Sequence, residues 1–411
     1  MISLGKKALE AKDFLASVTE EQKNKALMAI ADALRKNSET IIEANKIDIE
    51  NGENAGLGKG LIDRLMLDEK RINDIADSVV NVIHLPDPCG ITLDKIERPN
   101  GLVIQKVSVP IGVVGIIYEA RPNVTADAAV LCLKSANAVI LRGGKEAINS
   151  NIAISSVMRA AIKSCGFDEN CIQLVTDTSR NSANEMMKMN GYLDCLIPRG
   201  GKNLIKSVVE NSTVPVIETG SGNCHIYVDE YADVDMAAKI IFNAKTQRIS
   251  VCNSCESLVI HSAIINKAMP KIKELLDEKN VEIRGDARAM IAADGILPAN
   301  EEDFSTEYLD YIISVKTVDS LDEAVKHINK NSTRHSEAII TDNDAHAREF
   351  LQRIDSSSVY VNASTRFTDG GEFGLGAEIG ISTQKLHARG PMGLRELTTT
   401  KYLVFGNGQI R

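Results

Sequence analysis

The chain has 411 residues, of which 44% are hydrophobic and 25% are charged, and its formal net charge is −9. This length suits two or three domains, and the composition is that of a globular protein. Because no Lys/Arg run suggests a basic face and no window holds the ~18 consecutive apolar residues of a membrane span, we expect neither nucleic acid nor a membrane as a partner.

The eight cysteines are scattered, and most of them lie in apolar surroundings, as Cys132 does between Leu131 and Leu133. This usage is typical of reduced, buried thiols and not of a disulfide framework. The chain starts with a polar helical pattern in place of the apolar core of a signal peptide. These features predict a cytoplasmic protein.

The first 85 residues or so predict helices. Thr19 and Gln22 form a capping box in front of an apolar face between residues 26 and 34. Ser38 is expected to cap the next helix, and the glycine-rich stretch 56–60 interrupts the pattern.

Short β-rich runs then alternate with helical segments. The predicted strands are Leu102–Val107, Gly112–Tyr118, Ala138–Leu141, Ile172–Val175, Cys195–Ile197, Val214–Ile217, His225–Val228, Leu258–Ile260, Tyr311–Val315, Ala338–Thr341, Val359–Asn362 and the tail Thr398–Phe405. The predicted helices include Ala126–Ser135, Asn149–Lys163, Ala183–Met189, Ile264–Glu278 and Leu321–Ile328. Such alternation favours parallel sheets covered on both faces, in two α/β domains that divide near residue 220.

Cys252 is the first candidate for chemistry. It lies in a polar segment directly before the apolar run Leu258–Ile260, where a loop beside a strand can present a thiol to a substrate. A thiol of pKa ~8.5 needs a cation or exposed N–H groups nearby to act as a nucleophile, and Arg248 is the nearest cation in sequence. A buried structural cysteine is the alternative interpretation.

Cys252 and Cys255 also form a C-x-x-C pair, which is found in redox-active dithiols and in half of a zinc site. No second pair completes a set of four zinc ligands, so we expect no metal. A dithiol remains an open alternative.

Two glycine-rich turns carry basic residues where a helix is expected to begin, one around Gly143-Gly144-Lys145 and one around Arg199-Gly200-Gly201. Backbone N–H groups at such a position bind phosphate, although most Gly-Gly turns are turns only. Two such turns in one α/β domain favour a dinucleotide. Glu218 follows Val214–Ile217, where a strand end would place it in a ligand-binding crevice or in solvent.

Taken together, these residues resemble the aldehyde dehydrogenase superfamily and, within it, the glutamate-5-semialdehyde dehydrogenase (gamma-glutamyl phosphate reductase) family. The resemblance covers essentially the whole chain. Val109–Thr125 looks like this family's form of the Pro-x-Asn turn, and Ala324–Ile339 resembles its signature, with Asn331 departing from the usual His or Tyr. Residues 362–367 and 378–393 also look like this family.

The resemblance implies a catalytic role for Cys252 as nucleophile, Asn123 as oxyanion donor and Glu218 at the general-base position of hydrolytic relatives. Expected cofactor contacts are Lys145, Arg199, Gly200, Gly201 and Glu307. Expected contacts to an anionic substrate are Arg121, Arg248, His335, Arg366 and Arg389.

The implied fold is aldehyde dehydrogenase-like, with two parallel-sheet α/β domains and a small β element. Residues 1–90 and 110–220 are expected to bind NADP, residues 221–380 to form the catalytic domain, and residues 91–109 and 398–411 to supply oligomerisation strands. We therefore expect a homodimer or homotetramer, and glutamate 5-kinase is a candidate partner.

The implied reaction is the NADPH-dependent reduction of L-glutamyl 5-phosphate to L-glutamate 5-semialdehyde through a Cys252 thioester, in proline biosynthesis. The sequence leaves NADPH and NADH open, because Lys145 and Arg199 suit either a 2′-phosphate or a pyrophosphate. The role of Glu218 is also open, because water activation would waste a thioester. Three rival interpretations are a hydrolytic NAD-dependent aldehyde dehydrogenase, a non-catalytic member of the superfamily, and a dithiol oxidoreductase.

Overall fold

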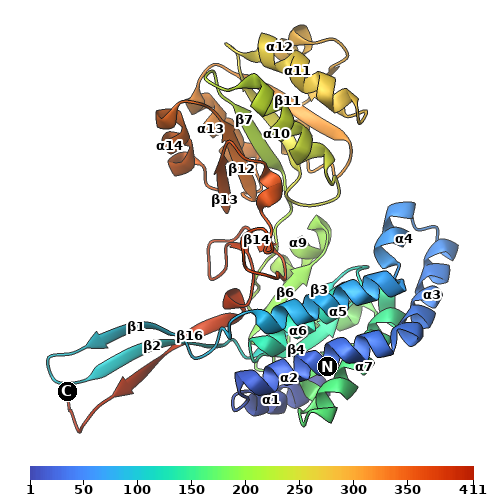
Figure 1. Cartoon of the computed structure of the whole chain (residues 1–411), viewed down its shortest axis with the longest axis vertical. Helices are drawn as coiled ribbons and strands as arrows, with labels where there is room; N and C mark the ends of the chain where they lie inside the picture. Colours follow the sequence, from blue (N-terminus) through green and yellow to red (C-terminus); the bar gives the residue numbers. More distant parts are fainter. The chain divides into compact units, whose positions relative to one another are not determined.

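The computed structural model describes all 411 residues, and the chain forms two compact units. Unit 1 comprises Met1–Thr219, Gly374–Gly380 and Met392–Arg411, and unit 2 comprises Gly220–Phe373 and Ile381–Pro391 (Figure 1). The return of Gly374–Gly380 to unit 1 differs from the expected second domain, which ran from 221 to 380. No helix combines the length and the apolar character that a membrane crossing requires.

Unit 1 contains a four-stranded parallel sheet in the order β5-β4-β3-β6, with helices around it (Figure 1). The strands are β3 (Val113–Tyr118), β4 (Ala138–Arg142), β5 (Ile172–Leu174) and β6 (Cys195–Arg199). The helices are α1 (Ile2–Leu15), α2 (Glu20–Lys36), α3 (Ser38–Asn54), α4 (Lys59–Leu65), α5 (Glu69–His84), α6 (Asn123–Lys134), α7 (Ile148–Ser164), α8 (Arg180–Met186) and α9 (Lys202–Asn211), with short 3-10 turns η1 (Lys145–Ala147), η2 (Glu169–Cys171) and η5 (Arg395–Leu397).

The start of α2 follows directly from its sequence. The Thr19 hydroxyl accepts a hydrogen bond from the Gln22 N–H, and the Gln22 side chain accepts one from the Thr19 N–H, so the predicted capping box is confirmed. The prediction for Ser38 is wrong, because Ser38 is already the first residue of α3 and Asn37 precedes it as the cap position.

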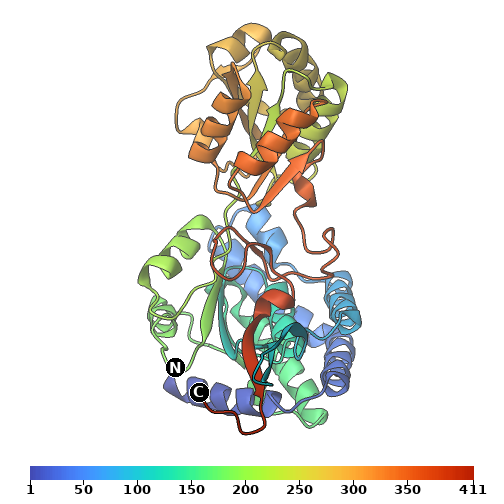
Figure 2. The same cartoon turned by 90° about the vertical axis from the view of Figure 1, so that its left-hand side faces the viewer.

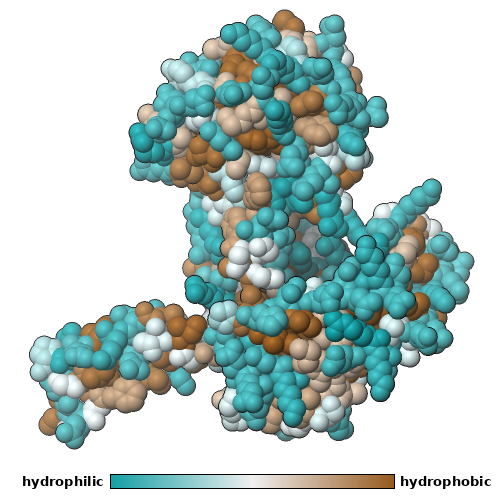
Figure 3. Space-filling model, viewed as in Figure 1, coloured by the Kyte–Doolittle hydropathy of each residue, from teal (hydrophilic) through white to brown (hydrophobic).

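Unit 1 also contains a three-stranded antiparallel sheet, which is called the arm below. It consists of β1 (Thr92–Glu97), β2 (Val103–Pro110) and β16 (Thr398–Phe405), with β2 in the middle. Strand β16 is therefore an edge, and its exposed apolar side chains include Tyr402 and Val404, which are 61% and 58% accessible. Figure 3 shows hydrophobic areas on the surface of this arm, at the lower left.

Unit 2 is built on a seven-stranded parallel sheet in the order β10-β9-β11-β8-β7-β12-β13. Figure 2 shows helices on both of its faces. The strands are β7 (Cys224–Val228), β8 (Cys255–His261), β9 (Glu282–Gly285), β10 (Leu297–Pro298), β11 (Ile312–Val318), β12 (Ser336–Ile340) and β13 (Ser358–Val361), with a separate pair, β14 (Ile381–Ser382) and β15 (Gly390–Pro391). The helices are α10 (Val234–Thr246), α11 (Ile265–Asp277), α12 (Ala287–Ala292), α13 (Leu321–Asn331) and α14 (Asp344–Arg353), with 3-10 turns η3 (Asp303–Ser305) and η4 (Thr365–Phe367).

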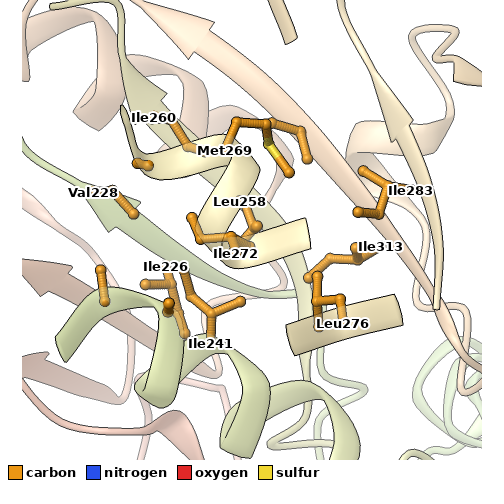
Figure 4. Packing of buried hydrophobic residues seen from close by; sticks show 14 of the residues in the cluster. Ile226, Val228, Ile241, Leu258, Ile260, Met269, Ile272, Leu276, Ile283 and Ile313 are labelled. Carbon is orange, nitrogen blue, oxygen red and sulfur yellow. The ribbon is translucent and has the colours of Figure 1, made fainter. Parts of the chain in front are cut away.

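Alternate residues of the central strands of unit 2 enter two different cores. Ile226 and Val228 of β7 point toward α10 and α11, together with Leu258 and Ile260 of β8 (Figure 4). Tyr227, which lies between Ile226 and Val228 in β7, packs instead with α13 and α14. Successive side chains of a strand point to opposite faces, so a strand covered on both faces must be apolar throughout. This explains why these strands read as continuous apolar runs.

One predicted strand does not form. Val214–Ile217 makes only an isolated bridge to β6, through hydrogen bonds of Leu196 with the Pro215 carbonyl and the Ile217 N–H. Pro215 has no N–H to extend a ladder, which limits the pairing. Strands β9 and β10 lie in segments where no strand was predicted.

Candidate active site

Cys252 lies in a tight turn at the amino end of β8. The turn is closed by a hydrogen bond from the Ser254 N–H to the Val251 carbonyl, and the Ser254 hydroxyl donates to the Ala244 carbonyl at the end of α10. Of the three cysteines in unit 2, Cys252 alone is partly exposed, whereas Cys224 and Cys255 are buried. The fold therefore presents the Cys252 thiol on a surface while anchoring its backbone.

Gly222 and Cys224 contact the backbone of Cys252. A Cβ atom added at Gly222 would lie 1.4 Å from the Cys252 carbonyl oxygen, so only glycine allows this approach. The Cys224 thiol donates a hydrogen bond to the same oxygen, with a sulfur-to-oxygen distance of 3.2 Å. The Gly222 N–H donates to Glu307 Oε1 at 2.6 Å, which brings the predicted cofactor-binding carboxylate next to the Cys252 turn.

Asn253 and Arg366 fix the other side of the turn. The Asn253 amide nitrogen donates to the carbonyls of Arg366 and Thr368, and the Arg366 guanidinium donates to the Asn253 side-chain oxygen and to Gln247 Oε1. Burial and the nearby Arg248 lower the pKa of Arg366, and the Cys252 thiolate opposes this shift. Two of the predicted substrate-binding arginines, Arg248 and Arg366, are thus brought together close to the thiol.

Cys255 points into the interior of unit 2, and burial raises its pKa well above that of a free thiol. Next to it, Lys245 at the end of α10 and Glu256 at the start of β8 form a fully buried ion pair with a nitrogen-to-oxygen distance of 2.6 Å. Burial raises the pKa of Glu256 to about 7, while the charge of Lys245 lowers it. The pair joins the two ends of the segment that carries Cys252.

Two predicted substrate contacts have other surroundings. His335 is fully buried, and its Nδ1 lies 2.8 Å from the Ser336 hydroxyl and 3.8 Å from the Cys224 sulfur. Arg389 donates to Asp355 at 2.8 Å. Lys385 and Arg389 both pair with Asp355 and together hold its pKa below its usual value.

Asn123 is the first residue of α6, in unit 1. Its side-chain nitrogen donates to Asp127 Oδ2 at 2.9 Å, one helical turn further on. Burial raises the pKa of Asp127 to about 6, although the hydrogen bond from Asn123 and the charge of Arg199 lower it. Because an ionised carboxylate only accepts hydrogen bonds, it turns the NH₂ end of the Asn123 amide toward itself and leaves one of its two N–H donors for another acceptor.

The glycine turn after β6 begins α9, as the sequence predicted for a phosphate-binding turn. Gly201 is the cap residue, and its N–H donates to Glu119 Oε2 at 2.8 Å. A Cβ added at Gly200 would lie 2.7 Å from the Glu119 carboxyl carbon. A carboxylate oxygen therefore already accepts from this backbone donor, which shows that the donor suits an anionic oxygen.

The other predicted cofactor residues of unit 1 lie near the ends of its strands. Lys145 is exposed in η1, directly after Gly144, and Arg199 ends β6 with partial exposure. Arg142 supports this edge by donating to the Thr178 and Ser179 carbonyls, and burial lowers the pKa of its guanidinium. Glu218 is half-buried in the segment that leaves unit 1, where the Thr219 hydroxyl donates to the Pro198 carbonyl.

One group of side chains in unit 2 has the composition of a metal site. Asp229, Glu230 and His346 lie close together after the carboxyl end of β7, whereas Cys252 lies at the amino end of β8. The oxygens of Asp229 already accept hydrogen bonds from the Tyr227 and Thr341 hydroxyls, and Oδ2 lies 2.9 Å from His346 Nδ1. These bonds explain the cluster without an ion.

Several residues of the site were missed in the sequence. Asp127 could have been found, because Asn and Asp four residues apart at the start of a helix face each other. Glu119 belongs to the Pro-x-Asn segment but had no assigned role. Gly222 and Cys224 have no local signal, because their partner Cys252 is 30 and 28 residues away in sequence.

The model of the aldehyde dehydrogenase family matches residues 3–291 and 298–403. The chain is 60% identical to a gamma-glutamyl phosphate reductase of Lachnospira eligens over 408 residues, which cover 99% of this chain and 98% of the relative. It is 58% identical to one of Clostridium botulinum over 411 residues, covering 100% and 99% of the two chains. The crystal structure of gamma-glutamyl phosphate reductase from Thermotoga maritima, 49% identical, superimposes with a TM-score of 0.98 and covers 100% of this chain and 99% of that one. The chain therefore belongs to the aldehyde dehydrogenase family of oxidoreductases, which use nicotinamide cofactors, and groups there with the gamma-glutamyl phosphate reductases.

Proposed function

We propose that this enzyme reduces L-glutamyl 5-phosphate to L-glutamate 5-semialdehyde with NADPH and releases phosphate, as a step of proline biosynthesis. The observation that carries the proposal is the partly exposed Cys252 on a turn held by Gly222, Cys224 and Asn253. The names of the relatives supply the substrate. A cytoplasmic location fits this pathway.

In the proposed reaction the Cys252 thiolate attacks the acyl carbon and forms a carbon–sulfur bond, the bond from that carbon to the phosphate oxygen breaks, and phosphate leaves, so that a thioester remains. Asn123 acts as an oxyanion donor through the N–H that Asp127 leaves available, together with the Cys252 backbone N–H. Arg248 and Arg366 favour the thiolate and attract the negatively charged substrate.

The nicotinamide cofactor, when bound, supplies the hydride. Lys145, Arg199 and the Gly200-Gly201 turn would hold its phosphates, and Glu307, close to the Cys252 turn, would hold its ribose. The fit rests on Gly201, whose N–H already donates to a carboxylate. After reduction, breaking the carbon–sulfur bond releases the aldehyde and returns the Cys252 thiolate.

Glu218 and the basic residues Arg121 and Arg389 complete the proposed site. Phosphate, and not water, is the partner exchanged at the acyl carbon, so Glu218 positions the cofactor or the thiol in this proposal. Arg121 and Arg389 contribute positive charge for the anionic substrate.

We also propose that β16 pairs with a second copy of the chain to give a homodimer or homotetramer. Its open edge and exposed Tyr402, Val404 and Phe405 support this, because unpaired apolar edges are otherwise a liability. Glutamate 5-kinase, which would supply the unstable acyl phosphate, is the proposed partner enzyme.

The direct test runs the reaction in reverse. Pyrroline-5-carboxylate, which equilibrates with the open semialdehyde, and NADP⁺ should give reduced cofactor only when phosphate is added. Equal rates with and without phosphate would favour the hydrolytic rival. The dithiol rival requires two reactive thiols, and the burial of Cys255 counts against it.

A further inference from the structure

We propose that Asp127, with the cavity it lines in unit 1, is the subsite that binds the α-ammonium group of the substrate. This inference rests on the proposed function, because only an amino-acid substrate carries such a group. It adds an assignment that the sequence left open, namely which residues distinguish a glutamyl group from any other acyl phosphate.

The cavity lies between α5, α6 and the segment 376–378 and has a volume of about 180 Å³. It is large enough for several water molecules, and so for the small polar end of an amino acid. Its walls include Val79, Val82, Asp127, Val130, Leu131 and Glu378.

The charge of the lining selects a cation. Asp127 and Glu378 are both acidic, and no Lys, Arg or His is part of the lining. Val79, Val82, Val130 and Leu131 provide an apolar surface for methylene groups. A glutamyl chain offers this lining its methylene groups and its ammonium group, and in this proposal the α-carboxylate on the same carbon is directed away from Asp127 and Glu378.

Asp127 connects this cavity to the proposed reaction centre. Its Oδ2 accepts from the Asn123 amide at 2.9 Å, so the cavity begins one hydrogen bond away from the proposed oxyanion donor. In an extended glutamyl chain, four bonds separate the reacting carbon from the α-nitrogen, a distance of roughly 5 Å from standard bond lengths. One substrate can therefore place its carbonyl oxygen at Asn123 and its ammonium group at Asp127.

The electrostatic state of Asp127 supports the same conclusion. The side chain of Asp127 is half-buried, and burial raises its pKa to about 6. Arg199 is the cation that acts on it from β6, and Glu378 faces the same cavity with a second negative charge. An ammonium group bound at this half-buried carboxylate would be less screened by water than at an open surface, which makes the interaction stronger.

The test compares two aldehydes that differ by the amino group. L-Glutamate 5-semialdehyde, supplied as pyrroline-5-carboxylate, and glutarate semialdehyde are each oxidised by the purified enzyme with NADP⁺ and phosphate. The quantity measured is the ratio of their kcat/KM values, in the natural protein and in Asp127→Asn. Ring closure to pyrroline-5-carboxylate lowers the concentration of the open aldehyde equally for both proteins. It therefore cancels when the ratio for the variant is compared with the ratio for the natural protein.

We expect Asp127→Asn to lower kcat/KM for the amino-bearing aldehyde roughly 10- to 100-fold more than that for glutarate semialdehyde, the scale of one charge-assisted hydrogen bond. Asp74→Asn removes the same charge from an exposed position of α5 and should leave the ratio unchanged. Asp127→Glu, which keeps the charge, should retain part of the discrimination.

Equal losses for both aldehydes would overturn the subsite and leave Asp127 as a residue that only orients Asn123. Should neither aldehyde be oxidised by the natural protein with phosphate, the proposed function itself fails, and the subsite with it. If Asp127→Asn does not fold, the inhibition constants of L-glutamate and glutarate on the natural protein decide, because these two acids differ only in the ammonium group. Equal inhibition by both would again overturn the proposal.

Discussion

Gly222→Ala is the substitution whose effect can be worked out most directly from the structure. The change adds one methyl group at a position that contacts no substrate in the proposed mechanism. That methyl carbon would lie 1.4 Å from the Cys252 carbonyl oxygen, 2.3 Å from the carbonyl carbon and 2.7 Å from Cα. All three atoms are backbone, so no flexible side chain can move aside.

The contact must open to at least 3.0 Å, the lower limit for a Cβ contact, which displaces the Cys252 carbonyl by about 1.6 Å (3.0 − 1.4). A misplacement of ~1 Å at a reacting group costs on the order of 10²-fold in rate. We therefore expect kcat to fall by about 10²-fold or more. Overpacking of this kind destabilises a protein by about 1–3 kcal/mol, so most of the protein should remain folded.

The assay measures phosphate-dependent turnover, the rate of Cys252 alkylation and thermal unfolding in the same preparation. Gly60→Ala is the matched control, because a Cβ there meets nothing within 4 Å. It should change none of the three quantities by more than a small factor. If Gly222→Ala folds and keeps more than about a third of the natural turnover, the argument that Gly222 positions the nucleophile is wrong.

Three further results follow from the structure. Cys252→Ser should lower turnover by orders of magnitude, because an alcohol is a far weaker nucleophile than a thiolate, whereas Cys255→Ser should keep most activity; equal loss in both, measured by reduced-cofactor formation, would favour the dithiol mechanism. Lys145→Ala should raise KM for NADPH more than KM for NADH, and an equal rise would show that Lys145 does not contact the 2′-phosphate. Deletion of residues 398–411 should lower the mass measured by light scattering, because β16 and its exposed edge are lost; an unchanged mass would exclude assembly through this strand.

Much of the fold could be predicted because its signals are local. The capping box at Thr19 and the apolar runs of β3, β7 and β8 each depend on residues close together in sequence, and the structure confirms them. Where the structure differs from the expectation, the cause is local in one segment and long-range in another. Val214–Ile217 has the composition of a strand, but Pro215 restricts it to one bridge. The return of Gly374–Gly380 to unit 1 depends on packing that no local pattern encodes.

The candidate site divides in the same way. Cys252 and Asn123 were identified by motif, and the role of each remains a proposal. The residues that hold Cys252 and Asn123 differ in how easily the sequence predicts them. Asp127 follows from helical spacing. Gly222 and Cys224 contact Cys252 only because β7 and β8 pair side by side. The missing information is the register of that pairing, which the sequence alone does not give.

Each unit fixes one of the two groups proposed to act at the acyl carbon, through side chains that make no bond to that carbon. In unit 2 the buried pair Lys245–Glu256 joins the ends of the Cys252 segment, and removing one partner would leave an uncompensated buried charge, a loss of about 3–5 kcal/mol. In unit 1 the Asp127 carboxylate sets the orientation of the Asn123 amide. Because thiol and amide are ordered before the substrate arrives, binding free energy is not spent on ordering them and remains available for the transition state. Substitutions at Lys245 and Glu256 should therefore lower kcat more than they raise KM, and this separates them from substitutions at the residues proposed to contact the substrate, Asp127 among them.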